Sequence, residues 1–143
     1  ELGMFNNIMV PVDLAHLEAL EPALSVVADL AKQYDAHITY VSVTANTPTS
    51  VARTPQEYEQ KLEAFAQERH KVHGQPVSSK VYSSTDPMAN IDTLLEKAID
   101  EVGADLVMMA THLPRHLDIV MPSHGGKVAT HTNASVFLIR LAQ

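Results

Sequence analysis

Short apolar segments alternate with longer amphipathic segments along almost the whole sequence, and this alternation limits the possible folds more than any other feature. The apolar runs show no regular polar alternation, which is expected of strands that are covered on both faces. The longer segments carry apolar residues three or four positions apart, which is typical of helices with one buried face. The sequence predicts strands over residues 7–12, 37–43, 77–82, 105–110 and 135–139, and helices over 18–34, across 58–69, over 86–102 and over 123–132.

Strands joined by helical connections run parallel, so the alternation predicts an α/β fold with an open, doubly wound sheet and helices on both faces. Ligands of such sheets bind beyond the carboxyl ends of the strands, where the winding direction reverses. The residues expected at those ends are Asp13, Val43 to Thr44, Ser83 to Asp86 and Ala110 to His112. The strand residues that we expect to be buried are Ile8, Val10, Val12, Ile38, Val41, Val43, Leu106, Met108, Val136 and Leu138.

Composition excludes several classes of protein. The 143 residues carry a net charge of −7 without a cluster of Lys and Arg, so neither a nucleic-acid surface nor a nucleic-acid partner is expected. The absence of cysteine excludes disulfides, thiolate zinc sites and cysteine nucleophiles, and it fits a cytoplasmic protein. No apolar run approaches the roughly 20 residues that span a bilayer. We expect a single domain over residues 4–143, preceded by a short cloning remnant at residues 1–3.

The common catalytic motifs are absent from the sequence. It has no Walker A loop, no Gly-x-Ser-x-Gly elbow and no HExxH pair. We therefore expect a protein that is not a dedicated enzyme. His112, His116, His124 and His131 do not form an i, i+4 pair on one predicted helix, and no carboxylate cluster accompanies them, so no metal site is expected.

Three segments together carry a family resemblance. Ile8-Met9-Val10-Pro11-Val12-Asp13 ends the first predicted strand, and Ala110-Thr111-His112-Leu113-Pro114 follows the fourth. Pro122-Ser123 comes after seven further residues and opens the last predicted helix. This pattern resembles the universal stress protein family over residues 4–140. It is most similar to the types F and G of that family, in which Ala-Ser-His-Arg-Pro and then Gly-Ser occur at the same spacing.

The resemblance implies a five-stranded parallel sheet of order 3-2-1-4-5, Rossmann-like or HUP-type, that binds ATP or AMP, with or without Mg²⁺, between strands one and four. It implies that Asp13 and Val43 flank the ribose and the adenine, and that the 110–114 loop lines the phosphates. Ser123 then bonds a phosphate oxygen at a helix N-terminus, which favours anions. The complete set of implied nucleotide-binding residues is Pro11, Val12, Asp13, Val43, Ala110, Thr111, His112, Pro114, Arg115, Pro122, Ser123, His124 and Gly125.

The resemblance also implies a homodimer that forms through the last strand. Val136, Leu138 and Arg140 are then expected at a sheet edge, where unpaired backbone groups can pair with a second copy. The dimer would report the bound nucleotide to a protein partner that the sequence does not identify.

Three positions depart from the glycines that let the family's backbone wrap closely around phosphates, namely Ala110, Leu113 and Pro122. Types F and G share the first two changes and still bind a nucleotide. Pro122 is the more serious departure, because proline has no N–H to donate to a phosphate. Gly125-Gly126 either compensate by letting the backbone approach a phosphate from a shifted position, or mark a helix that starts one turn later.

Two functions from different classes therefore stay open. One is a nucleotide-binding homodimeric sensor, and the other is a nucleotide-free dimeric scaffold of the same fold that has lost the phosphate-binding loop. A flavin-binding domain fits the topology less well, because Asp13 to His16 stand where a Ser/Thr-rich phosphate loop would follow the first strand.

Overall fold

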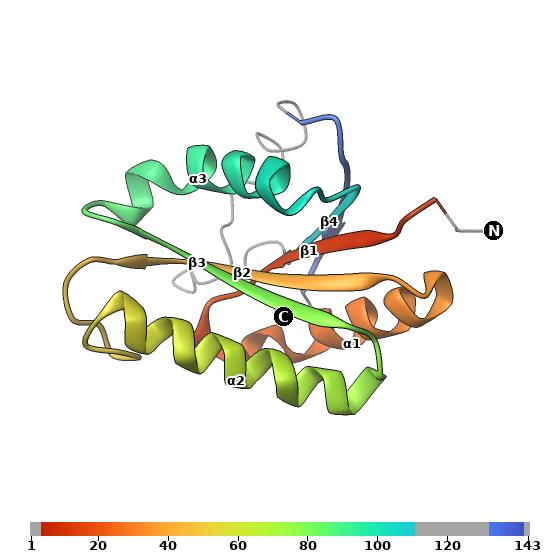
Figure 1. The fold of residues 1–143 in the computed structure, drawn as a ribbon, viewed down its shortest axis with the longest axis horizontal. Helices are drawn as coiled ribbons and strands as arrows, with labels where there is room; N and C mark the ends of the chain where they lie inside the picture. The colour runs from red at the N-terminus through yellow and green to blue at the C-terminus, as the bar shows by residue number, and fades with distance from the viewer. Residues whose placement is uncertain (1–3, 111–131, 142–143) are drawn as a thin grey trace.

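The computed structural model describes residues 4–110 and 132–141, which form one parallel sheet and three α-helices. The strand order is β3-β2-β1-β4-β5, which confirms the expected order and the doubly wound topology. Figure 1 shows α1 and α2 on one face of the sheet and α3 on the other. The elements are β1 (Asn7–Pro11), the 3-10 turn η1 (Leu14–His16), α1 (Leu17–Tyr34), β2 (His37–Ala45), α2 (Pro55–His73), β3 (Val77–Ser84), α3 (Pro87–Val102), β4 (Leu106–Ala110) and β5 (Ser135–Ile139).

Capping residues explain where α2 and α3 begin and end. Thr54 and Asp86 precede a proline at the first helical position, and each side chain accepts a hydrogen bond from the amide three residues later. Gly74 and Gly103 follow the two helices with φ of 79° and 67°, a left-handed conformation that favours glycine. These local signals extend α2 beyond the predicted 58–69 at both ends.

The core is divided between the two faces of the sheet. Successive residues Ile8, Met9 and Val10 of β1 are all buried, as predicted for a strand that is covered on both sides. Ile8 and Val10 pack beneath α1 and α2, whereas Met9 packs beneath α3. The central position of β1, between β2 and β4, accounts for this double coverage.

Most of the strand residues expected in the core are buried, with three exceptions. Ile8, Val10, Val12, Ile38, Val41, Leu106 and Met108 are buried as predicted. Val43 and Val136 are only half-buried. The prediction for Leu138 is wrong, because β5 is an edge strand and the Leu138 side chain is 44% exposed in the single chain. The predicted helix over 123–132 lies almost wholly outside the described residues.

Candidate functional site

The carboxyl ends of β1, β2 and β4 meet at one edge of the sheet. β1 pairs with β2 on one side and with β4 on the other, so this is the place where the winding reverses. The backbone amide of Val12 donates to the Val41 carbonyl at 2.9 Å and continues the pairing one residue beyond β1. Pro11, Val12, Asp13, Val43 and Ala110 therefore stand at the expected edge, and Ala110 and Val43 are half-buried there.

Asp13 caps the turn that follows β1. Its Oδ1 accepts a hydrogen bond from the Ala15 amide at 2.9 Å, and its Oδ2 lies 3.3 Å from Nδ1 of His16. The Asp13 side chain is still 38% exposed, so the carboxylate keeps surface toward solvent. Capping fixes the direction of this carboxylate and leaves lone pairs for a further donor.

Two hydroxyl groups that the sequence analysis missed hold the backbone on either side of Asp13. The Ser42 hydroxyl donates to the Val12 carbonyl at 2.7 Å, and the Tyr58 hydroxyl accepts from the Leu14 amide at 3.1 Å. Burial raises the pKa of Tyr58 above its ordinary value, and the nearby Asp13 carboxylate adds to the shift. Tyr58 is therefore a neutral phenol at physiological pH, able to serve as a hydrogen-bond partner.

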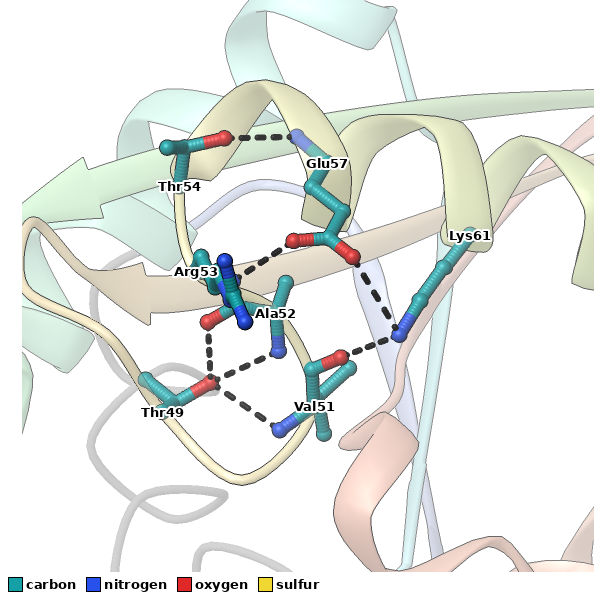
Figure 2. Close-up of polar contacts among 7 residues, drawn as sticks. All are labelled: Thr49, Val51, Ala52, Arg53, Thr54, Glu57 and Lys61. Atoms are coloured by element: carbon teal, nitrogen blue, oxygen red, sulfur yellow. Dashed lines mark hydrogen bonds and ion pairs between the residues drawn. The ribbon is translucent and has the colours of Figure 1, made fainter.

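The segment between β2 and α2 is held by a hydrogen-bonded network (Figure 2). The Thr49 hydroxyl accepts from the amides of Val51 and Ala52, each at 3.2 Å. The Glu57 carboxylate accepts from the Arg53 amide at 2.7 Å and lies 3.7 Å from Nζ of Lys61, which in turn donates to the Val51 carbonyl. The predicted loop over residues 45–55 is thus fastened to the first two turns of α2.

The remaining sequence-predicted site residues are not placed by the structure. Two larger hollows in the described part of the chain, of about 850 Å³ beside α3 and about 630 Å³ between η1 and α2, are lined by neither Asp13 nor Val43. No group of three His, Cys, Asp or Glu that could hold a metal ion occurs within residues 4–110 and 132–141.

The predicted site residues that lie outside the described residues are Thr111, His112, Pro114, Arg115, Pro122, Ser123, His124 and Gly125.

None of the helices in the described ranges has the length and apolar character that a membrane crossing needs.

Comparison with known proteins extends over nearly the whole chain. The sequence model of the universal stress protein family matches residues 4–140. A solved structure of a member of that family from Burkholderia pseudomallei is 21% identical with a TM-score of 0.70, and the match covers 97% of this chain and 98% of that one. A universal stress protein in complex with cAMP is 16% identical with a TM-score of 0.66, covering 96% and 98%.

A member of the same family from Arabidopsis thaliana, solved with AMP bound, is 14% identical with a TM-score of 0.63, and the match covers 96% of this chain and 92% of that one. At these identities the similarity to solved structures shows a shared fold. No curated protein sequence matches this chain.

Proposed function

Because this chain belongs to the universal stress protein family, we propose that it is a homodimeric sensor or regulatory protein that binds an adenine nucleotide, ATP or AMP. The observation that carries the proposal is the Asp13 carboxylate. It stands at the carboxyl end of β1, beside the point where the sheet winding reverses. The hydrogen bond from the Ala15 amide orients it, and part of its surface is open to solvent. A carboxylate in that position is suited to accept hydrogen bonds from ribose hydroxyls.

Relatives with the same fold support the choice of an adenine nucleotide. One has been solved with cAMP and another with AMP. In our proposal the adenine lies near Val43 and the phosphates near the segment that begins at Ala110, with Ser123 bonding a phosphate oxygen. Where Mg²⁺ accompanies the nucleotide, phosphate oxygens and water would supply most of its ligands, and Asp13 is the nearby carboxylate.

The proposed role is regulatory and not catalytic. The sequence carries no set of residues that would activate water strongly, so any hydrolysis of bound ATP would be slow. The same proposal includes three further points. They are the resemblance to types F and G, the cytoplasmic location suggested by the cysteine-free sequence, and a protein partner that is not identified.

The alternative is a dimeric scaffold that no longer binds a nucleotide. Pro122 favours it, because the position that carries a glycine in nucleotide-binding relatives here has neither an N–H donor nor freedom at φ. The two functions differ in whether the wild type binds a nucleotide, and the Pro122→Gly substitution shows whether proline is the cause of any loss.

Calorimetric titration of the wild type and the Pro122→Gly variant with ATP, ADP and AMP distinguishes them. If the site is intact, the wild type binds with micromolar affinity, about −8 kcal/mol, and Pro122→Gly binds more tightly because it regains an N–H donor. Failure of both proteins to bind at millimolar ligand would overturn the sensor function and leave the nucleotide-free scaffold. Binding by the glycine variant alone would identify Pro122 as the change that silenced an ancestral site.

A further inference from the structure

The backbone that presents Asp13 is held from both sides by side chains of other elements. Ser42 on β2 donates to the carbonyl of Val12, one residue before Asp13. Tyr58 on α2 accepts from the amide of Leu14, one residue after it. The Asp13 carboxylate, in turn, caps η1 by accepting a hydrogen bond from the Ala15 amide. The direction of the carboxylate therefore depends on both the backbone and the cap.

Of these contacts, the one from Tyr58 spans the greatest distance along the sequence. Tyr58 is 4% exposed, and it belongs to the core beneath α1 and α2. The Tyr58 hydroxyl accepts a hydrogen bond from the part-buried Leu14 amide. This amide is the first of η1, and the first amides of a helical turn have no acceptor within that turn. The hydroxyl group thus has a local task at the Asp13 turn that packing alone does not require.

Tyr58 is itself fixed in place by the segment that precedes it. Its amide donates to the Thr54 carbonyl at 3.1 Å in the first turn of α2. Glu57, next to it, accepts from the Arg53 amide and pairs with Lys61, which also holds the Val51 carbonyl (Figure 2). The β2–α2 segment and the Asp13 turn are therefore coupled through one side chain.

We propose that Tyr58 is a positioning residue for the nucleotide: its hydroxyl holds the Leu14 amide and so fixes the turn from which Asp13 reaches the ribose. This inference rests on the proposed nucleotide-binding function. It adds a residue on α2 to a site otherwise built from the ends of strands and the loops that follow them. The nucleotide does not need to touch Tyr58, because the residue acts through Asp13.

The test compares the wild type, Tyr58→Phe and a matched control, Tyr40→Phe. Tyr40 is also a buried tyrosine, but its hydroxyl faces Nε2 of His73 at 3.4 Å, toward the opposite end of α2. In nucleotide-free protein, amide exchange at Leu14 and Ala15 should accelerate in Tyr58→Phe and not in Tyr40→Phe. Tyr58→Phe should weaken ATP and AMP binding by about three- to tenfold, and Tyr40→Phe should leave it unchanged.

A double-mutant cycle with Asp13→Ala separates positioning from general destabilisation. If Tyr58 acts through Asp13, the Tyr58→Phe change has no further effect on affinity once Asp13 is alanine. Equal affinity of the wild type and Tyr58→Phe, or unchanged exchange at Leu14, would overturn the positioning role alone. Lack of nucleotide binding by the wild type would overturn the proposed function and the role of Tyr58 in it.

Discussion

His73 is a buried histidine whose neutral form holds the turn between α2 and β3. Its Nδ1 accepts a hydrogen bond from the Gln75 amide at 3.0 Å, and its Nε2 faces the hydroxyl of Tyr40. Burial lowers the pKa of His73 below its ordinary value, and the neighbouring Arg69, His70 and Lys32 side chains add to this shift. Protonation would also remove the acceptor at Nδ1, so the geometry and the charges both favour the neutral ring.

These contacts predict how the contribution of His73 to stability depends on pH. The unfolded chain, with an ordinary histidine pKa of about 6.5, binds the proton more readily than the folded protein. The contribution is therefore complete above that pKa and is lost as pH falls toward the lower pKa of the folded state. We expect His73→Phe to lower the free energy of unfolding by about 1 kcal/mol at neutral pH, and by less at pH 5.

Urea denaturation of both proteins across this range measures the difference. Parallel stability curves for the wild type and His73→Phe would contradict the assignment, because they would mean that His73 takes up its proton equally in the folded and unfolded states.

At the residue scale, the sequence identified the part of the candidate site that a local pattern marks. Asp13 was identified because it directly follows an apolar strand, and the structure places it at the strand end as a cap. The supporting hydroxyls of Ser42 and Tyr58 were missed, because they contact residues 30 and 44 positions away. No pattern within a short window reports such a contact. Only the assembled sheet and helix bring those groups to the Asp13 turn.

At the scale of single elements, the start of α2 depends on a short cap. Thr54 accepts from the Glu57 amide at 3.1 Å, and Pro55 occupies the first helical position. Thr54→Ala should lower the free energy of unfolding by about 1 kcal/mol, since it leaves an amide without its partner. Thr54→Ser keeps the hydroxyl and should retain most of that stability. Chemical denaturation of the two variants tests this, and equal losses in both would rule out the cap as the cause.

Element boundaries differed from the sequence-based ones where apolar periodicity gave no signal. β3 continues to Ser84 because its last residues pair with Thr44 and Ala45 of β2, although Ser83 and Ser84 have low strand propensity. Pro22 lies in the second turn of α1, past the first turn in which proline is best tolerated. At the end of β3, pairing with β2 outweighs the local preference of the two serines.

At the scale of the whole molecule, the alternation of strands and helices was enough to predict a doubly wound sheet, because connections through helices make strands parallel. It did not determine the order of the strands, which came from the family resemblance. The alternation also did not show which strands lie at the edges. The error at Leu138 comes from inferring burial from apolar composition alone, since a strand of the same composition is buried at the centre of a sheet and exposed at its edge.

The exposed edge of β5 leads to the prediction of a dimer. Phe137 and Leu138 are 40% and 44% exposed in the single chain, on a strand whose outer edge has no partner strand among the described residues. A second copy related by a twofold axis could pair with this edge in antiparallel fashion and cover both side chains. The proposed interface includes Val136, Leu138 and Arg140.

Sedimentation at micromolar concentration should give twice the chain mass of 15.6 kDa for the wild type. Leu138→Lys should shift the protein to the monomer, because an edge lysine opposes strand pairing and its charge would be desolvated at the interface. Val72→Lys is the matched control, since Val72 is 62% exposed on α2 and lies outside the proposed interface. A monomeric wild type, or a Leu138→Lys variant that stays dimeric while folded, would exclude pairing through β5.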